Sequence, residues 1–358
     1  MKIIDTIMRH LKKLPALVKH HPSWTFILFG VLVSLIAFLP HIGIMRFGTM
    51  STVYAYIIIL TTVALGLNLL LGFSGLISLG TAGFVGAGAL GTAVFLNMGF
   101  PLEIAVLAVL FISGLIGAVI GLFSLKVESI YLAIATLFVG EIMRQIYTNV
   151  PIFGGQELNL GDDSRNFVTF FGVWELSFFD QMHRSILFVI ITAAMVLSMI
   201  IIHHIIKSRT GRALMAMSRS QHAAQAMGVS LIKYRVMAFV IATLFATFGG
   251  VLYGIYYQSV PTEQWNLDLS LFLIAMIVVG GLKSIYGTVL GVFIIHGVPN
   301  LWLKNWFGDV SYVFSGVLII AVIIFYPRGF IHIGHDLRRA YAGLRTRMRK
   351  KVKHHGEN

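Results

Sequence analysis

Ten apolar runs of near membrane-spanning length restrict the folds that this sequence can adopt. They lie at residues 24–40, 51–72, 81–97, 101–122, 129–147, 185–206, 236–258, 267–282, 285–303 and 310–327. A helix needs about 20 apolar residues to cross the hydrocarbon core of a bilayer. Because only 11% of the residues are charged, against about 25% in soluble domains, the runs cannot all form a water-soluble core. We therefore predict an all-α integral membrane protein, a helical bundle of about ten transmembrane segments, some short or broken.

The positive charges are distributed unevenly between the predicted loops. With both termini in the cytoplasm, 22 of the 27 Lys and Arg residues lie inside, four lie outside and Arg144 lies within a span. Cytoplasmic loops carry such an excess of Lys and Arg. We therefore expect a basic cytoplasmic segment at 1–23, a transmembrane domain at 24–327 and a basic cytoplasmic tail at 328–358. Because the basic residues flank the spans, we expect the net charge of +13 to attract anionic lipid headgroups rather than nucleic acid.

Two of the predicted connections are long. The outer loop at 148–184 carries several acidic residues. The inner loop at 207–235 reads KSRTGRALMAMSRSQHAAQAMGVSLIKYR, and its apolar residues recur at helical spacing. This pattern predicts a helical cytoplasmic connection rather than a frayed one.

Glycine is unusually dense between Gly66 and Gly91, with eight glycines in 26 residues. In the second half of this stretch, small residues recur at four-residue steps at Gly83, Ala87 and Gly91, which predicts a face for close helix packing. The earlier part, at 72–80, lacks such a stripe, and we predict a break between two helices there. A break exposes backbone groups that must face protein or water, and transporters often place breaks at a binding or gating region.

A second predicted break at 280–287 repeats the order Gly-Leu-x-Ser that begins at Gly75, here beginning at Gly281. An internal duplication would leave such a match, although four positions also leave chance open. Polar residues within spans more often form helix–helix hydrogen bonds than contact a substrate. With both readings open, the candidates for the pathway or its gate are Asn68, Gly75, Ser78, Gly80, Thr81, Thr136, Glu141, Gly281 and Ser284.

Two charged residues lie in one span, Glu141 and Arg144. Their three-residue spacing allows an ion pair on one helix face, and a charge within the membrane is also a candidate for a pathway role. An ion-coupled carrier needs membrane carboxylates, and Glu141 alone lies well inside a predicted span. A channel would explain the glycine-rich breaks but not the helical inner loop.

The motifs of common catalytic sites are missing from the sequence. It has no G-x-x-x-x-G-K-[ST] nucleotide-binding loop, no H-E-x-x-H zinc motif and no cysteine. We therefore expect a chain that is not an enzyme and binds no metal or cofactor. The remaining classes are a transporter subunit, a channel and an ion-coupled carrier.

Four runs then carry a family resemblance in the same order. They are LGLNLLLGFSGLISLGTAGFVGAGA, YLAIATLFVGEIMR, GRALMAMSRSQHAAQAMGVSLIKYRVMAFVIATLFATFGGVLYG and IAMIVVGGLKSIYGTVLG. Together they resemble LivM-type permeases, the membrane subunits of branched-chain amino acid ABC importers. The likeness extends from about Leu65 to Leu290. It is specific for the family and not for the substrate, so urea or a short amide stays an alternative to a branched-chain amino acid.

The resemblance implies a set of partners in a bacterial inner membrane. They are a LivH-type permease subunit, two ABC ATPase subunits that hold ATP and Mg, and a periplasmic substrate-binding protein, which the outer loop would contact.

The resemblance also implies that residues 212–232 form a short coupling helix seated on an ATPase. Ala223, Ala224 and Gly228 match the A-A-x-x-x-G part of the docking loop, with Arg212 nearby. His222 stands where many ABC permeases have Glu, which weakens any claim for one docking ion pair.

Overall fold

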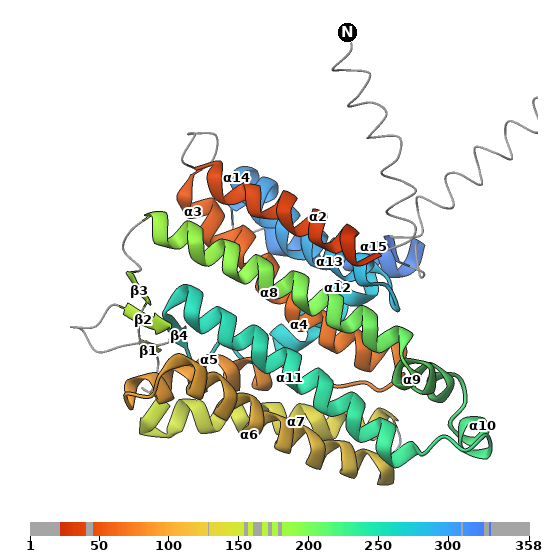
Figure 1. The fold of residues 1–358 in the computed structure, drawn as a ribbon. Coiled ribbons are helices and arrows are strands. Elements are labelled where there is room, and N and C mark those ends of the chain that lie inside the picture. The colour runs from red at the N-terminus through yellow and green to blue at the C-terminus, as the bar shows by residue number, and fades with distance from the viewer. Residues whose placement is uncertain are drawn as a thin grey trace, which may run out of the picture.

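The structure is a computed structural model that describes residues 22–40, 46–127, 129–153, 157–159, 167–170, 174–177, 181–308, 311–325 and 329–330. Most of the predicted basic segment at 1–23, part of the outer loop at 148–184 and nearly all of the tail at 328–358 lie outside the described residues. The described part is almost entirely helical (Figure 1).

The first half of the chain comprises α2 (Pro22–Ser34), η1 (Leu35–Phe38), α3 (Phe47–Thr49), η2 (Met50–Tyr54), α4 (Ala55–Asn68), η3 (Leu69–Phe73), α5 (Thr81–Asn97), α6 (Leu102–Phe123), η4 (Ser124–Lys126), α7 (Ser129–Asn149) and η5 (Pro151–Phe153). After the strands β1 (Glu157–Asn159), β2 (Phe167–Phe170) and β3 (Trp174–Ser177), the second half comprises α8 (Gln181–Lys207), α9 (Arg209–Arg219), α10 (Gln221–Ala226), α11 (Leu231–Tyr257), β4 (Ser259–Pro261), α12 (Leu267–Gly280), α13 (Ile285–Val292), η6 (Phe293–Gly297), η7 (Pro299–Leu303), α14 (Lys304–Phe307) and α15 (Ser311–Phe325). Of the η segments, η1, η4 and η5 are 3₁₀ turns, and the others are wound as π-helix.

The prediction of an all-α polytopic membrane protein is confirmed. Five described helical stretches are long and apolar enough to cross a bilayer, namely Thr52–Phe73, Leu102–Phe123, Met182–Lys207, Leu231–Tyr257 and Ile285–Leu303. Three shorter apolar stretches are Trp24–Phe38, Thr81–Asn97 and Leu267–Gly280. These helices do not by themselves establish the predicted count of ten. The four short strands, in the antiparallel pairs β1–β4 and β2–β3, are an addition to the predicted all-α pattern.

The outer surface of the bundle is apolar on α6 and α7. Phe111 and Leu107 on α6 are 74% and 68% exposed, and Phe138 on α7 is 60% exposed. Large apolar side chains in such numbers would be unfavourable against water, and they suit a face that contacts lipid.

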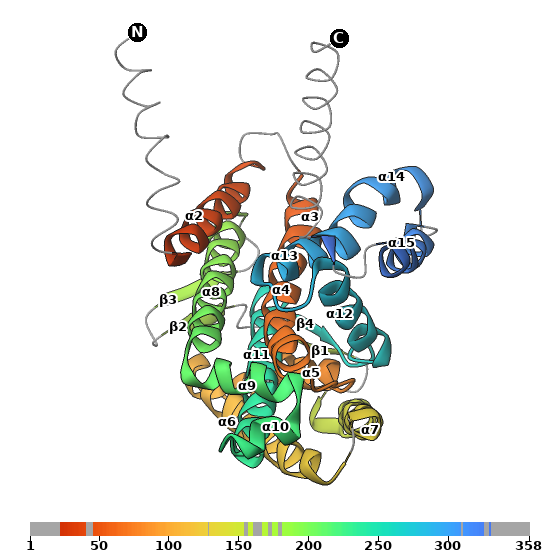
Figure 2. The same cartoon turned by 90° about the vertical axis from the view of Figure 1, so that its right-hand side faces the viewer.

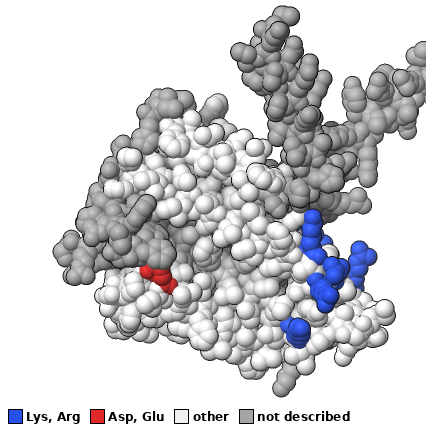
Figure 3. All heavy atoms as spheres, in the orientation of Figure 1, with Lys and Arg blue, Asp and Glu red and all other residues white. Residues whose placement is uncertain are grey.

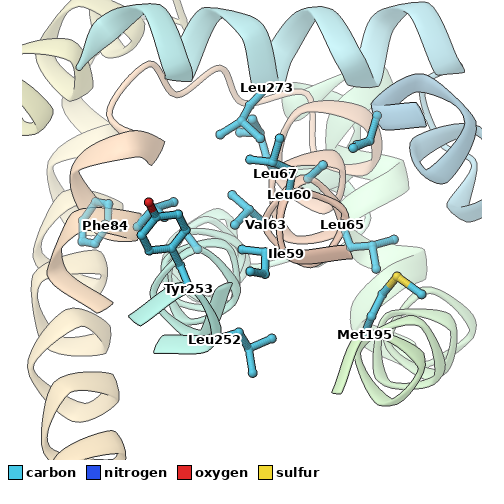
Figure 4. Close-up of a cluster of buried hydrophobic side chains, with 14 of the residues drawn as sticks. Ile59, Leu60, Val63, Leu65, Leu67, Phe84, Met195, Leu252, Tyr253 and Leu273 are labelled. Carbon is cyan, nitrogen blue, oxygen red and sulfur yellow. The ribbon is translucent and has the colours of Figure 1, made fainter. Parts of the chain in front are cut away.

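The core of the bundle is built around α4 and α11. Every residue of α4 from Ile57 to Asn68 is buried, and α11 packs against α4, α5 and α6. Figure 4 shows apolar side chains of five helices converging in this core, with α4 contributing Ile59, Leu60, Val63, Leu65 and Leu67.

Close approach of α5 and α11 depends on glycines. A Cβ atom added to Gly250 would meet the carbonyl of Val85, and one added to Gly88 would meet the carbonyl of Thr247. On another face of α5, a Cβ atom added to Gly83 would lie 2.9 Å from the Cα atom of Gly140 in α7. Gly83 of the predicted face therefore packs closely on α7, whereas the contact with α11 is made by Gly88, which lies outside that face.

The two ends of the bundle differ in structure and charge. The helices α9 and α10 lie at one end, whereas α3, α14 and the strands lie at the other (Figure 1). Figure 2 views the molecule from the end that carries α9 and α10. In Figure 3, Lys and Arg gather at that end, and the acidic residues in view lie at the opposite one.

Candidate translocation and coupling sites

The first predicted break is present between η3 and α5, where residues 74–80 are not helical. Gly75 adopts a φ of +72°, a conformation that favours glycine. The Leu79 N–H donates to the Thr136 hydroxyl at 3.0 Å, and the Ala82 N–H donates to the Ser270 hydroxyl at 3.0 Å. Side chains of α7 and α12 thus satisfy backbone groups near the break, as a membrane interior requires.

The second predicted break separates α12 from α13 at residues 281–284. Gly281 has a φ of +121°, and Lys283 has a φ of +64°. The Ser284 hydroxyl accepts the Gly287 N–H at 3.0 Å and so caps α13. Gly281 and Ser284 therefore form the turn itself.

Asn68 joins the end of α4 to this second break. Its side-chain amide donates to the Thr288 hydroxyl at 2.7 Å and to the Ser284 carbonyl at 3.2 Å. Its carbonyl oxygen accepts the Lys283 N–H at 3.2 Å. The Asn68 side chain is buried and cannot bond to water, so these protein partners satisfy its amide group.

Three more candidates of the first break are packed among helices. Gly80 lies against the carbonyl of Thr136 and against Gly140, so α7 crosses close to the break. Ser78 and Thr81 are buried and line a cavity of about 10 Å³ between α4, α5, α6 and α11. A space of that size is at the lower limit for one water molecule.

Glu141 and Arg144 form an ion pair on α7, as their spacing predicts. The Arg144 Nε donates to both carboxylate oxygens at 3.0 and 3.1 Å, and Gln145 donates to the same carboxylate at 3.2 Å. The membrane carboxylate that an ion-coupled carrier would need is therefore already paired here.

The inner loop forms two helices, so the expectation of one helix over 212–232 is wrong. Ser220 separates α9 from α10 with an extended backbone, and its hydroxyl accepts the Ala223 N–H at 3.3 Å. Gly228 follows α10 with a φ of +83°. A capping serine and a left-handed glycine therefore divide the loop.

Helix α9 packs on the membrane bundle and touches the first break. It buries Ala213, Leu214 and Met217 on one face. A Cβ atom added to Gly75 would lie 3.3 Å from the Cβ atom of Ser218 in α9. The inner loop and the first break are therefore in direct contact.

Helix α10 extends away from the bundle. His222 and Ala223 are exposed, Ala224 is buried and Met227 is 86% exposed. Arg212, also exposed, donates to the Lys207 carbonyl at 3.0 Å, so it holds the turn between α8 and α9. A methionine this exposed beyond the membrane surface is a candidate contact for a partner protein.

Arg235 has a structural role, although the sequence indicates only a loop charge at this position. It is buried at the start of α11 and donates to the Ser124 carbonyl and to the Gln221 side chain. Arg235 thereby ties α10 to the connection between α6 and α7.

A large cavity at the opposite end of the bundle is not predicted from the sequence. Its volume is about 440 Å³, within the usual range of small-molecule sites. The described residues that line it are Thr49, Thr52, Val53, Tyr56, Tyr253, Tyr257, His296, Asn300, Leu301 and Lys304.

Comparisons with known proteins agree with this architecture. A family model described as the permease component of branched-chain amino acid transport systems matches residues 49–323. The chain is 29% identical to the high-affinity branched-chain amino acid transport system permease protein LivM of Salmonella typhimurium, over 89% of this chain and 77% of that protein. It is 28% identical to LivM of Escherichia coli over the same shares.

A relative of another kind is the autoinducer 2 import system permease protein LsrC of Enterobacter sp., which is 26% identical over 83% of this chain and 82% of that protein. No solved structure matches the chain. Since the family model spans most of the sequence, the chain belongs to the LivM-type permease components of branched-chain amino acid ABC transport systems.

Proposed function

We propose that the chain is one of two membrane-spanning subunits of an ATP-driven importer that carries branched-chain amino acids across a bacterial inner membrane. A LivH-type permease is the second subunit, two ABC ATPases hold ATP and Mg, and a periplasmic protein delivers the solute. The basic end of the bundle faces the cytoplasm, and so do both termini. The LivM relatives and the uneven charge support this assignment.

The contact between Gly75 and Ser218 is the observation that carries the coupling proposal. Closure of the ATPases moves α10. The α9–α10 joint carries that movement to α9, and Arg235 carries it to the connection between α6 and α7. Because α9 touches the break at 74–80, the movement reaches the start of α5 within the membrane. Work is done only if the ATPases bind the inward and outward states with different affinity.

Hydrolysis of ATP by the purified complex in nanodiscs tests the function. We expect the cognate binding protein to stimulate hydrolysis when it carries leucine, and not when urea replaces leucine. Stimulation by urea alone would support the ATP-driven mechanism and would change the assigned substrate from a branched-chain amino acid to urea. The LsrC relatives make autoinducer 2 a useful third ligand. Absence of a copurifying ATPase and of hydrolysis would contradict the importer assignment.

Met227→Glu is expected to weaken ATPase binding by roughly tenfold, or about 1.4 kcal/mol, because it puts a charge on an apolar contact. The free subunit should be unaffected, since Met227 is 86% exposed. The measurement is the affinity of the permease pair for the ATPase in nanodiscs. Met98→Glu is the matched control, since Met98 is 53% exposed in the turn after α5, far from α10. If the two variants bind the ATPase with equal affinity, Met227 is not part of the docking surface.

A further inference from the structure

The 440 Å³ cavity lies at the end of the bundle opposite α9 and α10. It is formed where α3, η2 and α4 meet the last turn of α11 and the segment from η6 to α14. The last residue of α4, Asn68, is hydrogen-bonded to the second break, and α11 begins beside α10. Two of the helices that line the cavity, α4 and α11, therefore reach from it to the second break and to α10, respectively.

Aromatic rings form one wall of the cavity. Tyr253 and Tyr257 are neighbours on α11, with ring centroids 4.6 Å apart. The ring of Tyr56 in α4 meets both of them nearly edge-on, with centroid distances of 6.2 and 6.5 Å. The His296 ring centroid lies 4.7 Å from that of Tyr56. Ring faces and edges at this spacing accept a compact apolar group, and a ring face also attracts an ammonium group.

The charge of the lining is one-sided. Among the described lining residues, Lys304 carries the one permanent charge, and no Asp or Glu takes part. Lys304 is exposed at the start of α14, and Asn300 donates to the His296 carbonyl at 2.8 Å one turn earlier. An ammonium group at the edge of an aromatic cavity favours a ligand with a carboxylate.

The backbone around the cavity is irregular in three places. The segments η2, η6 and η7 are wound as π-helix, and they supply Thr52, His296 and Asn300 to the lining. In η6 the Val298 N–H bonds to the Phe293 carbonyl, and in η7 the Lys304 N–H bonds to the Pro299 carbonyl. Such windings are uncommon and occur frequently at functional sites.

We propose that this cavity binds the solute on its entry into the membrane and selects a small carboxylate with a compact apolar body. Lys304 holds the carboxylate, and the wall of Tyr56, Tyr253 and Tyr257 receives the apolar group and the ammonium of a zwitterionic amino acid. The role in transport rests on the proposed importer function, whereas the selection of a carboxylate rests on the lining alone. Urea, which has no carboxylate, gains nothing from Lys304.

Direct binding to the complete complex in nanodiscs, without the binding protein, tests the selection. Labelled leucine is the probe, and isovalerate, leucinol and urea are the competitors. We expect isovalerate, which keeps the carboxylate and the branched body, to compete, and leucinol and urea to compete poorly. Lys304→Met should weaken leucine binding by roughly tenfold, the scale of one charge-assisted hydrogen bond, while Lys304→Arg keeps most of the affinity.

Arg184→Met is the matched control, because Arg184 is an exposed cation at the same end of the bundle that does not line the cavity. Tyr257→Phe should retain leucine binding and Tyr257→Ala should lose it, since the ring rather than the hydroxyl forms the wall. Retention of ATP hydrolysis without solute by every variant shows that the complex remains assembled.

Several results would overturn the proposal. They are equal leucine affinities for Lys304→Met and Arg184→Met, competition by leucinol as strong as by isovalerate, or no leucine binding by the wild-type complex. If an anionic lipid occupies the cavity instead, the binding signal would follow the lipid composition of the nanodisc and would not change with the leucine concentration. This outcome would also overturn the proposal. If isovalerate binds through Lys304 but loaded binding protein never stimulates ATP hydrolysis, the importer function fails and the cavity assignment stands.

Discussion

Gly250→Val is expected to prevent the subunit from accumulating in folded form. A Cβ atom at this position would collide with the Val85 carbonyl and lie 2.9 Å from the Ala89 nitrogen, both backbone atoms of α5. Backbone cannot move aside as a flexible side chain can, so α5 and α11 would have to separate. We expect the free energy of unfolding to fall by about 3 kcal/mol or more, which is at the upper end of the effects of overpacking.

The measurement for Gly250→Val is the amount of monodisperse subunit extracted from membranes and its midpoint of thermal unfolding. Gly316→Val is the matched control, because a Cβ atom at Gly316 on α15 meets nothing within 4 Å. We expect Gly316→Val to match the wild type. Equal yield and unfolding temperature for the Gly250 variant would show that α5 and α11 are not closely packed.

Gly75→Leu is expected to abolish transport in a subunit that still inserts and assembles. For a leucine, adopting the φ of +72° costs about 1–2 kcal/mol, and its Cβ atom lies 3.3 Å from the Cβ atom of Ser218. The variant therefore alters the contact between α9 and the break at 74–80. The measurements are leucine uptake into proteoliposomes and ATP hydrolysis by the same sample.

Gly99→Leu separates backbone strain from loss of the α9 contact. Gly99 has a φ of +87°, and a Cβ atom there meets nothing within 4 Å. Both variants carry a similar strain, so both should lose similar thermal stability. We expect only Gly75→Leu to hydrolyse ATP without transport, and full transport by that variant would remove the break from the coupling path.

The two breaks could be predicted from the sequence because their glycines are locally unusual. Helix-packing glycines recur every four residues, and those at Gly72, Gly75 and Gly80 do not. Their partners could not be predicted in the same way. The bonds from Asn68 to Lys283 and Ser284 join positions 215 and 216 residues apart, and one sequence holds no local signal for them.

The inner loop contains a second signal that its helical periodicity hides. The periodicity continues across Ser220, so by itself it predicts one helix. A serine three residues before Ala223 is a common start of a helix, and Gly228 is a common end. These capping residues, weighed against the periodicity, divide α9 from α10.

The aromatic cavity left no recognisable pattern in the sequence. Its tyrosines lie near the ends of predicted spans, where aromatic residues are ordinary in membrane proteins. Their convergence with Lys304 follows from the packing of α4 and α11 against η6 and η7, which only the folded chain displays.

The bonds of Asn68 make the inner end of α4 respond in a concerted manner. One amide group holds the turn after α12 and the first residues of α13 through three hydrogen bonds. If α4 rotates about its axis, all three are strained together, and a partial rotation leaves buried polar groups without partners. Intermediate orientations are therefore disfavoured, and we expect α4 and the turn after α12 to move as one unit rather than independently of each other.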